Sequence, residues 1–367
     1  MGPSNTLLLL LKHLREQYDV AVVLPGYGSF TRALERERIP FFSLASMTKG
    51  SIPSLFRLIR GERFSLVYGN NTSSCSRNGI LAARLANVPT ICQVHAMGWG
   101  KSWRDLGFLK LAHATIAVSK ACARSISRFV PPDRLHVVYN GVETSPLEAG
   151  RDGPRSRLLA ETGLSPRDVI ATSVSHICPR KGQEYAIQAM ANIVAQAPSV
   201  HLLLVGSLDR DVAYVERIRA MIRAARLDDH VSMVGFRTDA EQLMRGSDLL
   251  LHTAIADPHP LAVLEGMAVR LPVVAFSVDG VAETIKHGQT GYLVPKGDVT
   301  ALADSVLHLA ADASLRMQLG SNARAHVEEH FSAESTARKI GDIIGITLNN
   351  RSRRRWWSLH HRGWSPS

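Results

Sequence analysis

Short apolar runs alternate with segments of helical periodicity along almost the whole chain of 367 residues. This alternation is typical of parallel sheets with helices on both faces, because each parallel strand needs a crossover to reach the next. The sequence therefore predicts an α/β fold with two doubly wound, Rossmann-like domains. The predicted strands lie near Val20–Leu24, Phe41–Leu44, Leu66–Tyr68, Thr90–Val94, Thr115–Val118 and Leu135–Tyr139, and then near Val169–Val174, His201–Val205, Val231–Val234, Leu249–Leu251, Val273–Ala275 and Tyr292–Val294.

The segment Ser145 to Arg157 interrupts this pattern, since it is rich in Gly, Pro and charged residues. We interpret residues 145–157 as a linker between an N-terminal domain at 1–144 and a second domain at 158–330. Two helices are expected near the end, with no strand after them, and residues 351–367 form a basic tail that contains Arg and Trp. The predicted helices include Ser74–Ala86, Ser119–Val130, Lys181–Ala197, Val212–Ala225, Ala313–Glu329 and Ala333–Leu348.

The first residues of the chain, Met1 to Asn5, resemble the turn that follows a strand. Ser4 or Asn5 is a candidate N-cap for a helix predicted over Thr6–Glu16. A doubly wound sheet normally has its first strand at the centre, directly before such a turn. We therefore expect the first domain to lack this strand, and hypothesise that the natural protein starts about 10–20 residues upstream.

The composition allows sizeable cores, because 45% of the residues are hydrophobic and 20% are charged. The leucines from Leu7 to Leu11 do not form a signal peptide, since no basic residue precedes them and Lys12 follows. No run approaches the roughly 18 apolar residues of a membrane span. The four cysteines show no C-x-x-C spacing, which favours reduced side chains in a cytoplasmic protein. They are Cys75, Cys92, Cys122 and Cys178.

The formal net charge is +11, and the tail Arg351 to Ser367 contributes five Arg and no acid. A basic balance favours anionic partners such as nucleotide diphosphates or acidic lipid headgroups. Nothing further in the sequence supports a nucleic-acid partner, so none is expected.

One stretch places two carboxylates eight positions apart, at Asp257 and Glu265, where a Pro-rich loop becomes a helix. Pro258 and Pro260 prevent a helix before Leu261, so the N–H groups of Leu261 and Ala262 are expected to face the loop as an anion site. A buried strand, Leu271 to Phe276, follows directly.

Other segments accompany this stretch in a fixed order: Val137–Val142, Val174–Gly182, Leu204–Gly206, Val234–Phe236, Val278–Ile285 and His287–Pro295. Together they resemble the retaining glycosyltransferases of family 4. The resemblance implies the GT-B fold, with two domains facing a cleft and a helix at 331–350 that crosses back to the first domain. It also implies sugar transfer from an NDP-sugar, preferably UDP-linked, to a cell-surface glycan or a lipid-linked acceptor. No metal or other cofactor is expected, because no D-x-D stands in a cleft-facing context, and the cysteines and the basic charge favour a cytoplasmic protein at the inner face of the membrane.

The resemblance also implies roles for single residues in the second domain. Lys181 matches the family's phosphate-binding lysine, and Glu265 the acid that accepts hydrogen bonds from the ribose hydroxyls. His176 stands where the family usually has Arg, so either Arg180 supplies the second cation or donor binding is weaker and depends on pH. Asp257 stands where the family usually has Glu, and would contact the transferred sugar.

Further roles follow at other strand ends. His95 follows a first-domain strand, and the resemblance implies that it contacts the donor sugar or its phosphate as a catalytic residue. The Gly2 amide would contribute to the phosphate site, and Gly235 and Phe236 would line the base pocket. No second carboxylate stands out as a nucleophile, so front-face displacement with retention is the implied mechanism.

Three alternatives remain at this stage. Gly26-Tyr27-Gly28 resembles part of a nicotinamide-binding fingerprint, but Thr31 replaces its third Gly. The tail, with Trp356, Trp357 and Trp364, could dock a non-catalytic adaptor at an anionic membrane. A nucleotide-sugar epimerase or hydrolase of GT-B shape is the third alternative.

Overall fold

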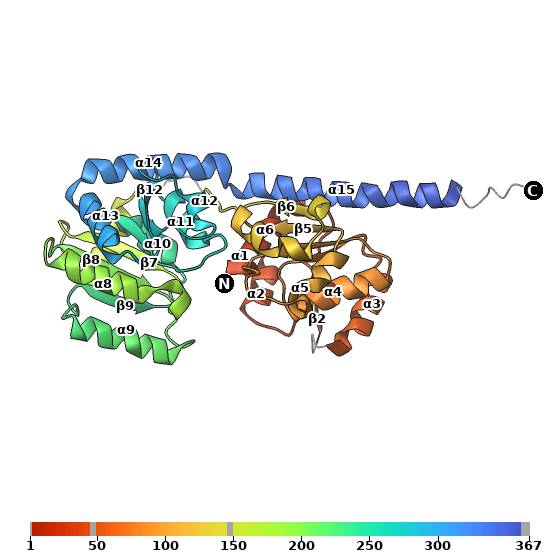
Figure 1. The fold of residues 1–367 in the computed structure, drawn as a ribbon, viewed down its shortest axis with the longest axis horizontal. Helices are drawn as coiled ribbons and strands as arrows, with labels where there is room; N and C mark the ends of the chain where they lie inside the picture. Colours follow the sequence, from red (N-terminus) through yellow and green to blue (C-terminus); the bar gives the residue numbers. More distant parts are fainter. Residues whose placement is uncertain (1, 45–48, 145–149, 361–367) are drawn as a thin grey trace, which may run out of the picture. The chain divides into compact units, whose positions relative to one another are not determined.

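The computed structural model describes residues 2–44, 49–144 and 150–360. The chain divides into two compact units (Figure 1). The first consists of Met1–Gly141 with Ala333–Ser367, and the second of Val142–Ser332. Every strand pairing in the described parts of both units is parallel, which confirms the α/β class that the alternating sequence predicted.

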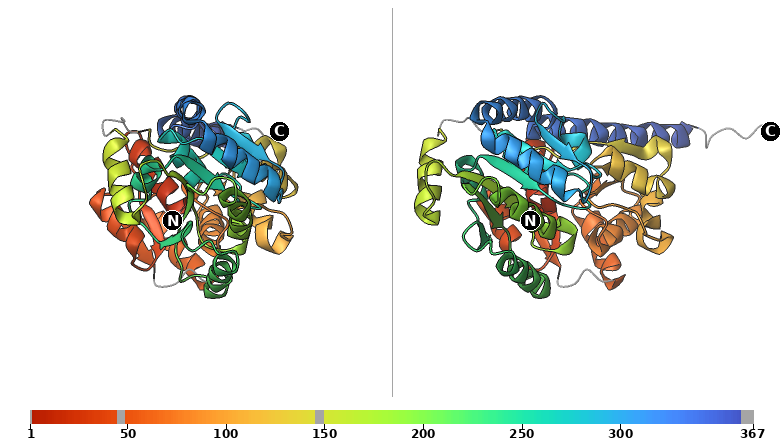
Figure 2. Two further views of the ribbon diagram at one scale, coloured as in Figure 1. Left: turned by 90° about the vertical axis from the view of Figure 1, so that its left-hand side faces the viewer. Right: turned by 60° about the vertical axis from the view of Figure 1, so that its left-hand side comes forward.

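The second unit holds one continuous six-stranded sheet, in the order β12-β11-β10-β7-β8-β9. Its central strands are buried on both faces and are almost entirely apolar, as parallel strands between two helical layers must be. Helix α8 packs against both α9 and α13, α7 packs against α10, and α11 packs against α14 (Figure 2). Its elements are α7 (Asp152–Thr162), β7 (Val169–Val174), η5 (Pro179–Lys181), α8 (Gln183–Val194), β8 (Val200–Val205), α9 (Val212–Ala224), β9 (Val231–Gly235), α10 (Ala240–Gly246), β10 (Leu249–His252), α11 (Leu261–Ala268), β11 (Val273–Phe276), α12 (Val281–Thr284), β12 (Gly291–Val294), α13 (Val299–Ala311) and α14 (Ala313–His330).

The strands of the first unit form two separate sheets, β1-β2 and β3-β4-β5-β6. The final helix α15 belongs to this unit and packs against α1. The elements are α1 (Gly2–Leu14), β1 (Val22–Pro25), α2 (Ser29–Arg36), β2 (Phe41–Leu44), η1 (Lys49–Ser51), α3 (Ile52–Gly61), β3 (Val67–Gly69), α4 (Ser74–Leu85), β4 (Thr90–Val94), α5 (Trp103–Leu106), η2 (Gly107–Leu111), β5 (Ala114–Ala117), α6 (Lys120–Ile126), η3 (Ser127–Phe129), η4 (Pro132–Arg134), β6 (Leu135–Val137) and α15 (Ala333–His360).

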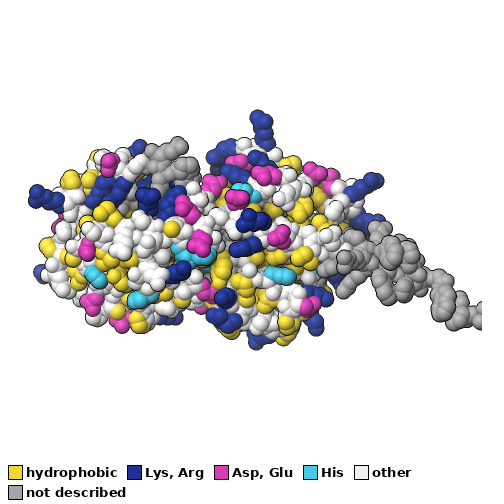
Figure 3. Space-filling view, turned by 90° about the horizontal axis from the view of Figure 1, so that it is seen from above, with side chains coloured by type: hydrophobic (Ala, Val, Ile, Leu, Met, Phe, Trp, Pro, Cys, Tyr) yellow, Lys and Arg dark blue, Asp and Glu magenta, His cyan; other side chains and the backbone are white. Residues whose placement is uncertain are grey.

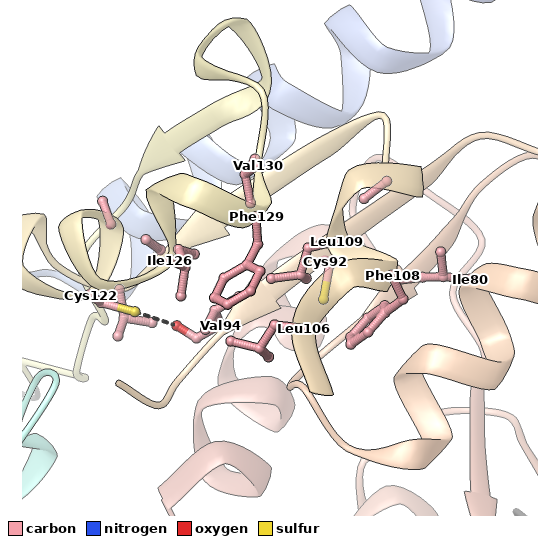
Figure 4. Close-up of a cluster of buried hydrophobic side chains, with 14 residues drawn as sticks. Ile80, Cys92, Val94, Leu106, Phe108, Leu109, Cys122, Ile126, Phe129 and Val130 are labelled. Carbon is pink, nitrogen blue, oxygen red and sulfur yellow. Dashed lines mark hydrogen bonds between the residues drawn. The ribbon is translucent and has the colours of Figure 1, made fainter. Parts of the chain in front are cut away.

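Within the described residues no strand joins β1 of the first sheet to β3 of the second. Side chains bridge the interval instead: Tyr18 and Val20 pack in one cluster with Leu66 and Tyr68. Leu10 and Leu14 of α1, and Ile340, Ile343 and Ile344 of α15, complete this cluster. A second cluster lies between α4, α6 and the α5–η2 segment, where Leu106, Leu109, Ile126 and Phe129 are buried together (Figure 4).

Two predicted boundaries near the chain start and the linker are wrong. Helix α1 begins at Gly2, so Ser4 and Asn5 lie inside it and neither is its N-cap. Pro3 is tolerated there because the first helical turn needs no N–H partner. Residues 152–157 of the predicted linker belong to α7, where Pro154 again stands in the first turn and Leu158 is buried. Residues 145–149 lie outside the described residues.

Three predicted helices have different limits. The helix expected from Lys181 begins at Gln183, because Gly182 has a left-handed φ of 65° that ends the short η5 turn. The helix expected over Ser119–Val130 stops at Ile126 and is followed by η3. Helix α15 runs to His360 and so includes part of the tail, while residues 361–367 lie outside the described residues.

Charged side chains of both signs are interspersed on the face drawn in Figure 3. Although the net charge is +11, the basic side chains on that face are therefore not separated from the acidic ones. Within the part of the chain that the structure describes, no helix has both the length and the apolar character needed to span a membrane.

Candidate functional site

The strand order of the second unit reverses between β7 and β10. From β7 the chain continues to β8 and β9 on one side, whereas β10, β11 and β12 follow on the other side. Because all six strands are parallel, their carboxyl ends share one edge of the sheet, and ligands of such sheets bind at the edge where the order reverses. Lys181 follows β7 and Asp257 follows β10, so both lie at this switch point.

Lys181 and Asp257 form a largely buried ion pair across the switch point. Lys181 Nζ lies 2.5 Å from Asp257 Oδ2, and the two side chains are 13% and 7% exposed. Lys181 is therefore not a solvated lysine at a helix start. Because charges this deeply buried lose much of their hydration, each stabilises the charged form of the other, and removal of either one alone is costly.

Backbone contacts hold the two loops together. Ile255 N–H donates to the Arg180 carbonyl oxygen at 3.0 Å, and the Thr253 hydroxyl donates to the Lys181 carbonyl oxygen at 3.1 Å. A Cβ atom on Gly182 would lie 2.2 Å from the Thr253 carbonyl oxygen, so only glycine fits this crossing. The position of Lys181 relative to Asp257 is thus fixed by the backbone.

His252 adds a third group to the pair. This buried side chain ends β10, and its Nε2 lies 3.5 Å from Asp257 Oδ2, at the limit of a hydrogen bond. Burial acts to raise the pKa of Asp257, but His252 and the Lys181 charge outweigh it, so the pKa is lowered overall. Burial lowers the pKa of His252, which keeps the imidazole neutral. Asp257 is therefore a carboxylate held between an ammonium and an imidazole.

The loop that carries Asp257 is fixed from the other side by the turn after β11. Asp257 N–H donates to Asp279 Oδ2 at 3.1 Å, and Gly280 N–H donates to the Asp257 carbonyl oxygen at 3.1 Å. Helix α11 begins at Leu261 after Pro260, as the two prolines predicted. The N–H groups of Leu261 and Ala262 therefore have no partner within the helix.

Glu265 lies one turn into α11. Burial, with a smaller contribution from the charge of Glu241, raises the pKa of Glu265. Among the described residues its carboxylate makes no ion pair. A carboxylate in this state gains strongly from hydroxyl donors, because hydrogen bonds to the charged form offset the cost of its burial.

A group of cations surrounds His176, which follows β7. Arg210 Nη1, from the loop after β8, lies 3.4 Å from His176 Nε2. Burial first, and then the charges of Arg210, Lys181 and Arg180, lower the pKa of His176. Arg180 itself donates to the Ala256 carbonyl oxygen at 2.9 Å. The structure therefore supplies Arg210 as a cation directly beside the position where the family usually has Arg.

Gln183 fixes the backbone of this loop. Its Nε2 donates to Ser175 Oγ at 3.0 Å and to the His176 carbonyl oxygen at 2.9 Å. Gln183, Arg210 and His252 are absent from the residues that the sequence suggested. The signal that could have identified Arg210 and His252 is their position in or just after the carboxyl ends of strands, where α/β sheets place ligand-binding residues.

The remaining predicted residues lie at other strand ends. Gly235 ends β9 with a φ of 79°, and its carbonyl oxygen accepts from Gly206 N–H at 2.9 Å. Phe236 follows and is 51% exposed, so its ring is available to a ligand.

His95 and Gly2 belong to the first unit, apart from the residues above. His95 follows β4, its Nε2 lies 3.3 Å from Asn70 Oδ1, and burial lowers its pKa to about 4. It is therefore neutral at pH 7. Gly2 is the first residue of α1, so its N–H is not bonded within the helix.

No three or more His, Cys, Asp or Glu side chains within residues 2–44, 49–144 and 150–360 are arranged to hold a metal ion.

Comparisons with known proteins identify the family of the chain. A family profile described as Glycosyltransferase Family 4 matches residues 2–146, and one described as Glycosyl transferases group 1 matches residues 155–326. The chain belongs to the group 1, family 4 glycosyltransferases and has the GT-B fold. It is therefore an enzyme and not a non-catalytic adaptor, and the family it belongs to is not that of the nicotinamide-dependent alternative.

Three similar proteins have informative names. The chain is 31% identical over 235 residues to N-acetyl-alpha-D-glucosaminyl L-malate synthase of Bacillus anthracis, a match that covers 64% of this chain and 60% of that protein. It is 23% identical over 362 residues to the Escherichia coli UDP-Gal:alpha-D-GlcNAc-diphosphoundecaprenol alpha-1,3-galactosyltransferase, covering 91% of each chain. The crystal structure of Anabaena Alr3699/HepE in complex with UDP and glucose superposes with a TM-score of 0.82 and 25% identity, over 94% of this chain and 96% of that chain.

Proposed function

We propose that this enzyme is a retaining glycosyltransferase that takes its sugar from a UDP-sugar and transfers it to a cell-surface glycan or a lipid-linked acceptor. The observation that carries the proposal is the buried pair of Lys181 and Asp257 at the strand-order reversal, 2.5 Å apart. The UDP complexes of the Anabaena protein and the UDP-Gal donor in the name of the Escherichia coli relative support the choice of nucleotide.

The diphosphate of the donor binds near Lys181. Lys181 is already committed to Asp257, so the ammonium is shared between the carboxylate and a phosphate oxygen when the donor is bound. Arg210 and the N–H groups of Leu261 and Ala262 supply further positive charge or dipoles. Neutral His176 contributes a hydrogen bond rather than a charge, which makes Arg210 the second cation of this site.

Two carboxylates bind the hydroxyl groups of the donor. Glu265, whose pKa is raised by burial, accepts hydrogen bonds from the ribose hydroxyls, which stabilise its charged form. Asp257 stays charged because its pKa is lowered, and it contacts the transferred sugar and the positive charge that develops at the anomeric carbon. Phe236 and the backbone of Gly235 line the base pocket.

The transfer proceeds on one face of the sugar. The bond between the anomeric carbon and the diphosphate oxygen breaks, and the acceptor oxygen forms its bond from the same side. The acceptor's proton passes to the departing diphosphate, so the products are UDP and the glycosylated acceptor. His95 of the first unit, which is neutral at pH 7, hydrogen-bonds the donor sugar or its phosphate, and Gly2 N–H contributes a further dipole.

The reaction needs no metal in this proposal, because cationic side chains and helix N–H groups neutralise the leaving group. The lipid-linked substrate in the name of the Escherichia coli relative supports an acceptor held at the inner face of the cytoplasmic membrane. The basic tail at 351–367 would strengthen binding to this anionic surface.

A donor panel tests the proposal. The enzyme is incubated with several UDP- and GDP-sugars, and both thermal stabilisation and nucleotide release are measured. A saturating donor should stabilise the protein by at least ~2 kcal/mol, and UDP should be the released nucleotide. Product analysis separates transfer from epimerisation or hydrolysis. Stabilisation by none of the UDP-sugars, or equal turnover after Asp257→Ala and Glu265→Ala, would contradict the site.

A further inference from the structure

Asp257 uses one of its two carboxylate oxygens for contacts within the second unit. Lys181 Nζ lies 2.5 Å from Oδ2, and His252 Nε2 lies 3.5 Å from the same oxygen. No described residue hydrogen-bonds to Oδ1, and this oxygen is not among the polar atoms that are sealed from solvent. The carboxylate is therefore held through Oδ2, and Oδ1 can accept hydrogen bonds from a ligand at the switch point.

The two groups that hold Oδ2 differ in what a bound donor does to them. In the proposed function, the diphosphate shares the Lys181 ammonium with Asp257. An ammonium is a compact charge on a flexible stem, so each phosphate contact that it gains weakens its contact with Oδ2. The Asp257 side chain is only 7% exposed, and water does not readily replace what it loses. A second N–H donor inside the protein offsets this loss.

His252 is placed to be that second donor. It ends β10, which lies between β7 and β11, so its backbone is fixed by strand pairing on both sides. Its Nε2 is sealed from solvent without an ordinary hydrogen bond, and Asp257 Oδ2 is the acceptor beside it. Burial lowers the pKa of His252, so the ring carries a single proton at pH 7. Because a carboxylate only accepts, this proton lies on Nε2.

We propose that His252 is a positioning residue: its Nε2–H holds Asp257 Oδ2 while the diphosphate draws on Lys181, so that Oδ1 stays directed at the transferred sugar. The contact of 3.5 Å is long for a hydrogen bond, and such contacts of catalytic groups often shorten in the reacting complex. His252 itself touches no substrate. The proposal rests on the proposed function, since it requires Lys181 on the diphosphate and Asp257 on the sugar.

A matched pair of side chains lies at the opposite edge of the same sheet. His201 Nε2, near the start of β8, lies 3.7 Å from Oδ2 of Asp168, which directly precedes β7. Both side chains are largely buried, and the His201 ring stacks on His230. Ligands of such sheets bind at the carboxyl ends of the strands, whereas this pair lies at the amino ends. His201 is therefore a control for the loss of a buried histidine beside an aspartate.

Three variants test the proposal. His252→Leu removes the N–H donor at similar size, His252→Gln restores an amide N–H close to the position of Nε2, and His201→Leu is the control. UDP release from the best UDP-sugar of the donor panel is measured. His252→Leu should lower kcat about 10- to 100-fold, as expected for one hydrogen bond to a charged group. His252→Gln should recover most of this loss, and His201→Leu should leave kcat unchanged.

Binding of UDP separates positioning from a general structural role. UDP carries no sugar, so its Kd should change by less than about threefold in both His252 variants while kcat falls in His252→Leu. An equal UDP-induced rise in melting temperature also shows that the variants are folded. The proposal is wrong if UDP affinity and kcat fall together, if His252→Leu keeps its kcat, or if His252→Gln is as slow as His252→Leu.

A double variant separates this proposal from the proposed function. In the Asp257→Ala background, His252→Leu should cause no further loss of kcat, because His252 acts through that carboxylate. The same fractional loss in both backgrounds would contradict the positioning role alone. Wild-type turnover of Asp257→Ala would contradict the proposed function, and the positioning role with it.

The tautomer of His252 can be tested without turnover. Long-range nitrogen–proton correlation NMR is recorded at pH 7 on the chain with isotope-labelled histidine, and the signal that is absent from His252→Gln is assigned to His252. This signal should show the proton on Nε2. A proton on Nδ1 alone would leave two acceptors facing each other at Asp257 Oδ2, and would overturn the proposal whatever the kinetics show.

Discussion

Both units contain parallel sheets, but they differ in how many candidate site residues lie at the ends of their strands. The second unit has one continuous six-stranded sheet, and Lys181, Asp257 and His252 meet where its strand order reverses. The first unit has two separate sheets, and only His95 among its described strand ends was singled out as a candidate, with Asn70 beside it. The candidate site residues are therefore concentrated where the strand order of a continuous sheet reverses, and the α/β class alone does not determine where they lie.

The largest effect is expected at the ion pair. In the proposed function, Lys181→Ala removes the cation that binds the diphosphate, and Asp257→Ala removes the acid that contacts the sugar. Each should reduce turnover with the best UDP-sugar by about 100- to 1000-fold, the usual loss when one electrostatic contact to the transition state is removed. Lys296→Ala, at an exposed position of the same unit, should leave turnover unchanged.

The double variant shows whether the pair acts in function or only in folding. Each single variant leaves one buried charge unpaired, which costs about 3–5 kcal/mol of unfolding free energy. Lys181→Ala with Asp257→Ala leaves none, so stability in urea should partly recover while turnover stays lost. Recovery of turnover together with stability would show that the pair has a structural role only.

The next largest effect concerns the close approach of the two loops at the switch point. Gly182→Ala combines a left-handed φ with a Cβ 2.2 Å from the Thr253 carbonyl oxygen and should cost about 3 kcal/mol in urea unfolding. Gly163→Ala, with a φ of 71° and open space around its Cβ, should cost only about 1 kcal/mol. Equal costs would mean that the loops separate without penalty.

The sequence predicted the fold better than the site. Every predicted strand is present within three residues, because fully buried parallel strands such as Val273–Phe276 are continuous apolar runs. Helix limits were less accurate where a glycine decides them. Gly182 separates η5 from α8, and the Thr253 carbonyl oxygen packs directly against it. That contact is tertiary, so the local sequence does not reveal it.

The sequence suggested candidate site residues where a local motif carries them, and did not suggest the neighbouring polar residues that no motif carries. Lys181, Asp257 and Glu265 each belong to a short pattern around one strand end. Arg210 and His252 reach the site through the neighbouring strands, and nothing in their own segments distinguishes them from other polar residues. Their contribution depends on which strands are adjacent, which periodicity alone does not determine.

A pH measurement compares one histidine from each unit. Burial lowers the pKa of His95 and of His326 to about 4, against an unfolded value of about 6.5. Between pH 6.5 and pH 4 each of these histidines therefore binds a proton in the unfolded chain but not in the folded chain. The free energy of unfolding consequently decreases as the pH falls from 6.5 towards 4. His95→Gln should lose about 1–2 kcal/mol less stability than the wild-type chain between pH 7 and pH 5. His326→Gln should change the slope in the same direction but by less, because that side chain is only half-buried and solvent screens it. A slope unchanged by either substitution would mean that both side chains are already solvated.

The smallest effect, and the sharpest test of how neighbouring strands share a site, concerns Arg210. Arg210→Gln removes the cation 3.4 Å from His176 and should raise the Kd for UDP about tenfold, as expected for one cation on a phosphate. Arg217→Gln is the matched control, since Arg217 pairs with Glu184 at 2.6 Å on the surface and should leave the Kd unchanged.

A second substitution places a cation after β7 to replace the one removed after β8. His176→Arg in the Arg210→Gln background places a guanidinium after β7, where the family usually has it, and should restore most of the lost affinity. Titration calorimetry with UDP at low and at moderate salt measures both steps, and the Arg210→Gln chain should show the weaker salt dependence because it has lost one charge contact. If His176→Arg restores nothing, the loop after β8 does not substitute for the missing arginine, and the second cation has to be sought at Arg180.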